Sequence, residues 1–102
     1  MDFRFDNKDL EKLYIEGRSR KYRLPEDIVD KFFARIRQLE SANDIHDLWN
    51  DKGLNFEKLQ GYESRYSMRL KLKYRLEMIV DWQNNKNEIG EFIIIDISNH
   101  YS

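Results

Sequence analysis

The strict alternation of apolar and polar residues from Tyr66 to Trp82 is the feature that most constrains the fold of this chain. Its apolar positions are Tyr66, Met68, Leu70, Leu72, Tyr74, Leu76, Met78, Val80 and Trp82. A period of two is that of a β-strand, in which successive side chains point to opposite faces of the sheet. Because this run is too long for one ordinary strand, we expect two antiparallel strands joined by a tight bend near Lys71–Lys73.

The polar positions of this segment hold a row of cations: Arg69, Lys71, Lys73 and Arg75. A three-residue bend would keep Arg69 and Arg75 on the same outer face, and no acid lies between residues 65 and 75. Like charges opposite each other on a sheet are unfavourable without a counter-anion, and a phosphate backbone would supply one. A solvated strand face shows the same pattern, so the row alone leaves both interpretations open.

A second acid-free basic segment covers residues 17–23. It contains Arg18, Arg20, Lys21 and Arg23. Together with the cations of 65–75 it holds half of the 18 basic residues, whereas all 19 acidic residues lie elsewhere and the net charge is −1. This segregation indicates local polyanion sites rather than a protein coated in positive charge.

Helical periodicity dominates the first half of the chain. A short helix is predicted over Asp9–Gly17, and a long one over 24–42, where Pro25 suits the first turn and apolar residues recur on one face. A third helix is predicted at 44–50, with Asn43 as its cap. Two further strands are predicted: a short one at 54–59, and a nearly continuous apolar one at 92–97, central and covered on both faces.

The pattern therefore predicts an α+β domain spanning residues 1–102, with N-terminal helices packed on one face of a mostly antiparallel sheet of about four strands. The chain has 102 residues and no cysteine, and 40% of its residues are hydrophobic. No run is apolar enough for a membrane span, and no signal peptide is recognised, so we expect a cytoplasmic protein without membrane contact. His46 has no partner at metal-ligand spacing, and we expect neither metal nor cofactor.

The aromatic and C-terminal residues each allow two interpretations. Trp49 and Trp82 favour the core, whereas Tyr62 and Tyr66 could stack on RNA bases or pack internally. If the chain stays extended, Asp96, Ser98 and His100 share one face. From the pattern alone, Asp96 is more typical of a strand end, and His100 and Tyr101 of a fraying tail.

The order of short motifs resembles that of the HigB group of RelE/ParE toxins. The motifs are YSMRL (66–70), YRL (74–76) and FIIID (92–96), preceded by RKYRLPEDI (20–28) and by ANDIHDLW (42–49). The resemblance covers nearly the whole chain. It implies a RelE-like fold and the activity of a ribosome-dependent mRNA endonuclease that uses no metal. It also implies a HigA-type helix-turn-helix antitoxin as partner, alongside the ribosome and mRNA, with operator DNA reached only through the antitoxin.

The resemblance also implies which residues carry the reaction. The expected catalytic residues are Arg69, Arg75, Asp96, His100, Tyr101 and Glu57. The expected RNA contacts are Lys58, Arg65, Lys71, Lys73, Arg18, Arg20 and Lys21. Most such toxins end in Asp-Tyr-His directly after the last strand, whereas here Ile97 and Ser98 occupy the Tyr and His positions and the His-Tyr pair follows later.

Two other functions remain open at this point. A ParE-like inhibitor of DNA gyrase would use the same fold without an acid–base pair. A non-catalytic module would use the basic face only to bind nucleic acid or an acidic partner.

Overall fold

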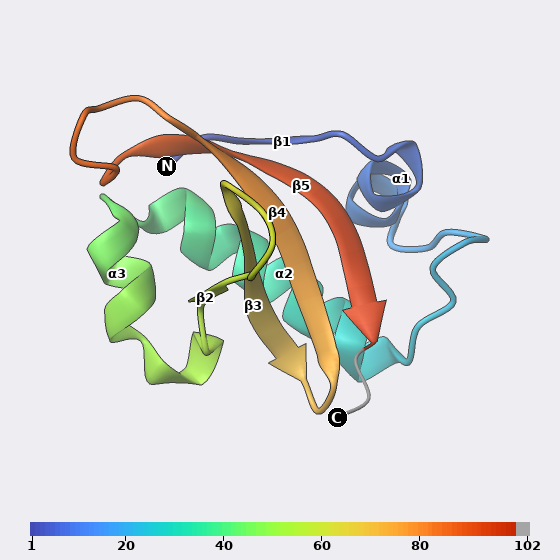
Figure 1. The fold of residues 1–102 in the computed structure, drawn as a ribbon. Coiled ribbons are helices and arrows are strands. Elements are labelled where there is room, and N and C mark those ends of the chain that lie inside the picture. The colour runs from blue at the N-terminus through green and yellow to red at the C-terminus, as the bar shows by residue number, and fades with distance from the viewer. Residues whose placement is uncertain (100–102) are drawn as a thin grey trace.

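The protein consists of a helical layer packed on one face of a five-stranded sheet (Figure 1). The computed structural model describes residues 1–99, and the predictions for His100 and Tyr101 therefore lie outside the described residues. In chain order the elements are β1 (Phe3–Phe5), α1 (Lys8–Glu16), α2 (Glu26–Ser41), α3 (Ile45–Asn50), the 3-10 turn η1 (Lys52–Leu54), β2 (Glu57–Lys58), β3 (Arg65–Lys71), β4 (Tyr74–Trp82) and β5 (Gly90–Asn99).

The strands lie side by side in the order β1-β5-β4-β3-β2. All neighbours are antiparallel except β1, which runs parallel to β5 with Phe3 opposite Phe92. The sequence predicted about four strands, and the additional one is β1, because three residues are too few to show a period.

The amino group of Met1 donates to the carbonyls of Leu39 and Ala42 at 3.1 and 2.7 Å, at the C-terminal end of α2. A cation is favoured there by the helix dipole.

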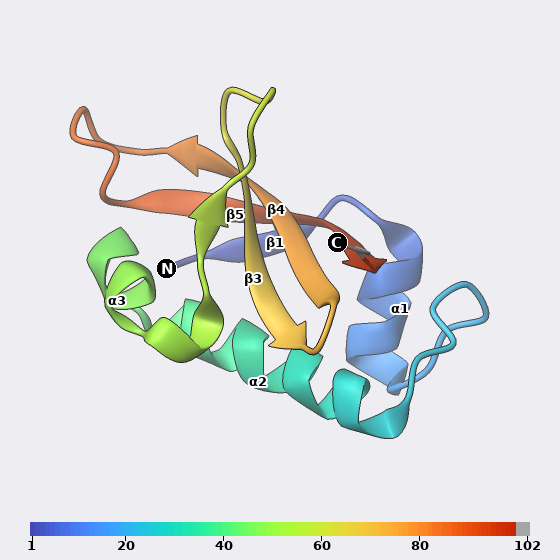
Figure 2. The same ribbon diagram turned by 60° about the horizontal axis from the view of Figure 1, so that its bottom comes forward.

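Helix α2 lies beneath β3 and β4, with α3 and α1 at its two ends (Figure 2). Its apolar stripe is fully buried, as predicted, and consists of Ile28, Phe32, Ile36 and Leu39. The sheet contributes Met68, Leu70, Leu76 and Met78 to the same core. The alternation seen in the sequence is therefore the alternation between this core and the opposite face, which we call the open face.

The turn between β3 and β4 consists of two residues, Leu72 and Lys73, where a bend of three was expected. Lys71 pairs with Tyr74, and the register shifts between Arg69 and Lys71. Arg69 lies directly opposite Arg75, so the prediction that they share a face is confirmed. Leu72 at the tip is exposed and has a positive φ of 54°. Leu72 is therefore a turn residue and is not one of the buried apolar residues that the alternation predicted.

Strand β5 lies inside the sheet, between β1 and β4. The predicted burial of both faces is correct only for the helix side, where Phe92 and Ile94 are fully buried. Ile93 and Ile95, on the other side, remain partly exposed. A register shift opposite Glu77 and Met78 marks a β-bulge, which redirects the end of the strand.

The cap of α3 differs from the prediction. Asp44, not Asn43, is the N-cap, and its carboxylate accepts from the amide of His46 at 2.9 Å. The amide of Asn43 donates to the Asp47 side chain instead. A side chain one residue further along the chain therefore takes the capping role.

The aromatic residues pack mainly on one another. Tyr66 is buried and stacks on Phe56 with an interplanar angle of 4°, which excludes it from base stacking in this conformation. Trp82 packs edge-on against Tyr66, whereas Trp49 is 45% exposed, more than a core residue would be. Tyr62 is exposed beneath the Arg65 guanidinium. None of the helices within residues 1–99 has the length and apolarity needed to cross a membrane.

Candidate active site on the open sheet face

Two rows of polar residues cross the open face in register. In the first row, which we call the acidic row, Glu57 pairs with Ser67, Ser67 with Glu77, and Glu77 with Asp96. In the second row, which we call the arginine row, Arg69 pairs with Arg75 and Arg75 with Ser98. Side chains directly opposite each other in an antiparallel pair lie on the same face, so the two rows lie side by side on the open face.

The expectation of a cation row without counter-anions is therefore wrong for Lys71 and Arg75, whereas Arg69 makes no ion pair within residues 1–99. Arg65 donates two hydrogen bonds to Glu77, at 2.9 and 2.6 Å. Lys71 donates to Asp27 of α2 at 2.7 Å. The acids lie outside the basic segment, 12 and 44 residues away in the sequence. Folding therefore pairs cations that have no acidic neighbour along the chain. Lys73 also has an interaction partner.

Arg75 is held by several acceptors. Its Nε donates to Ser67 Oγ at 2.8 Å, its Nη2 donates to the carbonyl of Asn55 at 2.6 Å, and Glu57 Oε1 lies 3.4 Å from Nη2. Only 12% of the Arg75 side chain is exposed. Burial lowers the pKa of its guanidinium, and neighbouring Arg69 lowers it further. Arginine nevertheless stays charged at neutral pH, so a fixed cation lies at the centre of the row.

Arg69 is arranged differently. Its backbone carbonyl accepts from Arg35 Nε of α2 at 2.8 Å, which fixes the chain beneath it. Its side chain is exposed and makes no hydrogen bond or ion pair within residues 1–99. The pair therefore combines one preset guanidinium with one that can adjust to an anion.

Ser98 completes the arginine row on the side of β5. Its Oγ is buried and has no hydrogen-bond partner among the residues that the structure describes. A buried hydroxyl without a partner is unusual, because burying a polar group without a hydrogen bond costs free energy. Its position opposite Arg75 makes it a candidate donor to an anion held there.

Asp96 is part of a different network at the end of β5. Its Oδ1 accepts from the Tyr22 hydroxyl at 2.7 Å, and that hydroxyl accepts from Asn7 Nδ2 at 2.8 Å. Asn7 also caps α1 through its Oδ1 and donates to the carbonyl of Ile95. Asp96 therefore connects the end of β5 to the loop after α1 through the hydroxyl of Tyr22. Asn7 supports this connection by donating to the same hydroxyl.

The other predicted RNA contacts are divided between two places. Lys58 is exposed on β2, beside Glu57. Arg18, Arg20 and Lys21 lie in the loop between α1 and α2, outside the arginine row. The two basic segments therefore lie on different elements, a loop and a pair of strands.

Sequence reasoning gave no role to four residues that shape this face: Ser67, Glu77, Asn55 and Tyr22. Ser67 is fully buried under Arg75, and Asn55 offers its carbonyl from a left-handed conformation with φ 44°. The signal for Glu77 was available, because it is the first of only two acids in the alternating segment, and it directly follows the run of cations, where pairing with a cation is expected. The roles of Ser67 and Asn55 depend on strand register, which the sequence does not show.

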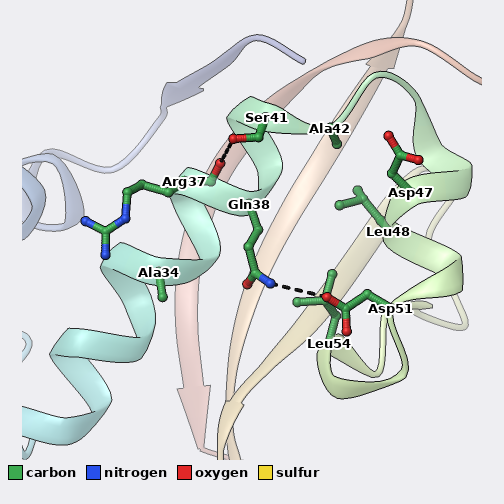
Figure 3. A pocket seen from close by; sticks show the side chains of 9 residues that line it. All are labelled: Ala34, Arg37, Gln38, Ser41, Ala42, Asp47, Leu48, Asp51 and Leu54. Carbon is green, nitrogen blue, oxygen red and sulfur yellow. Dashed lines mark hydrogen bonds between the residues drawn. The ribbon is translucent and has the colours of Figure 1, made fainter.

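A cavity lies on the helix side, between α2 and α3 (Figure 3). It has a volume of about 500 Å³, with Ala34, Leu48 and Leu54 among its lining and Asp51 at the rim. Gln38 of α2 donates to Asp51, the residue that follows α3, at 3.2 Å. This cavity contains none of the predicted site residues.

Comparison with a solved structure identifies the class of fold. The YoeB/ParE toxin from Agrobacterium tumefaciens aligns with a TM-score of 0.61 over 99% of this chain and 100% of that chain, at 16% sequence identity. The expected RelE-like fold is thereby confirmed.

The family follows from the sequence profile that the chain matches. Residues 3–94 match the HigB-like toxins, the RelE-like toxins of type II toxin–antitoxin systems. The chain therefore belongs to the HigB-like toxin family. A search of curated proteins gives no match. The matched region ends before Asp96, so the profile says nothing about the strand end.

Proposed function

We propose that this type II toxin is a ribosome-dependent mRNA endonuclease that arrests translation. The observation that carries the proposal is the arginine row, in which Arg75, preset by three acceptors, lies directly opposite the exposed Arg69. Two guanidinium groups on one face form a fitting site for a phosphodiester, because guanidinium groups bind phosphate oxygens through paired hydrogen bonds.

The proposed reaction uses the 2′-hydroxyl of the substrate as the nucleophile. Attack on the adjacent phosphorus forms the 2′,3′-cyclic phosphate and breaks the bond to the 5′-oxygen, which leaves as a hydroxyl after protonation. This step requires a proton acceptor, a proton donor and stabilisation of the additional negative charge on phosphorus. Arg69 and Arg75 would provide the charge stabilisation.

Proton transfer is assigned to residues around this pair. Glu57, half exposed beside Arg75, is a suitable acceptor for the 2′-hydroxyl proton. His100 is the proposed donor, because its usual pKa lies near neutral pH, with Tyr101 orienting the phosphate. Asp96 already accepts from Tyr22, so we assign to it the positioning of the strand end. Lys58, Arg65, Lys71 and Lys73 would contact flanking RNA.

The antitoxin expected for a type II system is, in this proposal, of the HigA type with a helix-turn-helix domain. Operator DNA would be reached only through that antitoxin. No cofactor is required for the reaction, and the protein would act in the cytoplasm.

The decisive experiment is to map mRNA 5′ ends in translating cells after induction without antitoxin. We expect new ends within translated messages, and relief of growth arrest by Arg75→Ala or His100→Ala at matched expression. Intact mRNA with a DNA-damage response before translation fails would support a gyrase inhibitor instead. Intact mRNA with continuing translation would contradict the proposal.

A further inference from the structure

The loop between α1 and α2 forms a second cationic site, whose lining contains no residue of the arginine row. A pocket of about 400 Å³ opens there. It is lined by Lys12, Glu16, Arg18, Ser19, Arg20 and Arg23. Figure 1 shows this loop beside α1, at the end of the molecule away from α3. We call this site the loop pocket.

The cations of the loop pocket are not used by the fold. Within residues 1–99, the side chains of Lys12, Arg18, Arg20 and Arg23 make no hydrogen bond or ion pair. All four are exposed, and Glu16 is the one carboxylate in the lining. Several cations held close together repel one another, and an anion between them removes that repulsion.

The loop that carries these cations is held in one shape by the rest of the chain. Gly17 begins it in a left-handed conformation with φ 78°. Ser19 Oγ accepts from the amides of Lys21 and Tyr22, which closes a turn. The Tyr22 hydroxyl then donates to Asp96 at the end of β5. A binding site on such a loop loses less conformational entropy when it engages a ligand.

The lining also indicates the class of ligand. It contains no aromatic or aliphatic side chain that could hold a base or another ring, although pockets for small molecules are predominantly apolar. The groups present recognise charge alone, and contacts of that kind position a nucleic acid without reading its sequence. We infer that the loop pocket binds the phosphate backbone of RNA, as an anchoring site separate from the site of cleavage. This inference rests on the proposed RNA substrate.

Lys21 provides a matched control within the same loop. It is exposed like the cations of the loop pocket, but it lies over the Tyr22 ring, 6.0 Å from the centroid, and does not line the pocket. Arg20→Gln and Lys21→Gln therefore remove the same charge at adjacent positions. Glu16→Gln changes the pocket in the opposite direction.

The test is binding of a fluorescein-labelled single-stranded oligoribonucleotide to the purified protein, without ribosomes, across a salt series. The triple variant Arg18→Gln/Arg20→Gln/Arg23→Gln should bind about 10- to 100-fold more weakly. Its slope of log affinity against log salt should fall by about 2, since each phosphate contact on a single strand contributes about 0.7. Arg20→Gln should weaken binding more than Lys21→Gln, and Glu16→Gln should tighten it.

Three results would overturn the inference: unchanged affinity in the triple variant, equal losses in Arg20→Gln and Lys21→Gln, or no tightening in Glu16→Gln. The triple variant is compared with wild type by thermal unfolding, because exposed loop residues should leave the fold intact. The assay contains no cleavage step. Loop-dependent binding together with intact mRNA in cells would therefore contradict the proposed function and still support the loop pocket.

Discussion

The two basic segments of this toxin use the same residue type in opposite ways. On β3 and β4, Arg65 and Arg75 are held by carboxylates, a hydroxyl and a backbone carbonyl. In the loop pocket, Arg18, Arg20 and Arg23 make no such contact within the described residues. Both segments look alike in the sequence, where each is a run of cations without acids.

The difference shows what each segment is suited to do. A guanidinium held in place before the substrate binds loses little energy to reorganisation, which is the condition for stabilising charge in a transition state. An exposed guanidinium contributes long-range attraction and contacts that adapt to the ligand. The sheet face therefore fits chemistry at one phosphate, and the loop pocket fits attachment to several.

The largest expected effect contrasts the two members of the arginine row. Arg75→Ala should reduce the rate of mRNA cleavage by about 10²–10³-fold, the usual result of removing a preset charge-stabilising donor. It should also lower the free energy of unfolding by about 1–3 kcal/mol, because the Asn55 carbonyl and Ser67 lose their partner. Cleavage is measured by primer extension in a translation extract, and stability by urea denaturation.

Arg69→Ala separates the two effects. The Arg69 side chain makes no hydrogen bond or ion pair within residues 1–99 and only repels Arg75, so this variant should lose cleavage while being at least as stable as wild type. Arg75→Lys keeps the charge but not the forked geometry, and it should remain impaired. Full activity in Arg69→Ala would remove Arg69 from the site and leave a single phosphate-binding arginine.

The second prediction concerns the pair of Glu77 and Arg65. Glu77 has only 6% of its side chain exposed and Arg65 has 25%, so Glu77→Gln leaves a largely buried cation without its carboxylate. The free energy of unfolding should fall by about 3 kcal/mol. Glu91→Gln is the matched control, since its pair with Arg4 lies at the surface and should contribute less than about 1 kcal/mol. Equal effects in the two variants would contradict the distinction between held and exposed cations.

Residues 65–82 illustrate how much of this molecule the sequence predicts. The alternation correctly predicts two strands, their core face and the shared side of Arg69 and Arg75, because side-chain parity is a local property. It does not predict that Glu57 and Asp27 approach these cations, because those contacts depend on register and helix placement. Strand β1 was not predicted either, because it is short and its partner β5 lies almost at the other end of the chain.

The third prediction tests the connection between the two basic regions. Tyr22→Phe removes the hydroxyl that joins Asn7 to Asp96. At neutral pH the free energy of unfolding should fall by about 1–2 kcal/mol, because Asp96 and Asn7 lose a partly buried hydrogen bond. Tyr62→Phe, at an exposed ring, should leave stability unchanged. A Tyr22→Phe protein as stable as wild type would show that the loop is held by other contacts.

The same variant predicts a pH dependence. Burial, together with the hydrogen bond to Asp96, raises the pKa of Tyr22 above its usual value of 10.0. The folded protein therefore holds this proton more tightly than the unfolded chain does. The resulting stabilisation is fully present below about pH 10 and declines as the pH rises further, by at most about 1.4 kcal/mol per pH unit. The stability difference between wild type and Tyr22→Phe should shrink over that range, as measured by urea denaturation.

The smallest expected effect concerns the turns of the two basic segments. Both require a left-handed residue, supplied by Gly17 in the loop and by Leu72 in the hairpin. A left-handed conformation costs a residue with a side chain about 1–2 kcal/mol, whereas glycine in a turn costs about 0.5–1 kcal/mol in lost freedom. Because Leu72 is 76% exposed, Leu72→Gly sacrifices little packing and should raise the free energy of unfolding by about 0.5 kcal/mol.

Asn87→Gly is the control for this substitution. Asn87 also has a positive φ, of 55°, but asparagine tolerates this conformation, so glycine should bring no gain there. Urea denaturation of both variants separates relief of strain from a general effect of glycine. If Leu72→Gly instead lowers stability, the leucine side chain makes a stabilising contact at the hairpin tip that outweighs the conformational cost at this position.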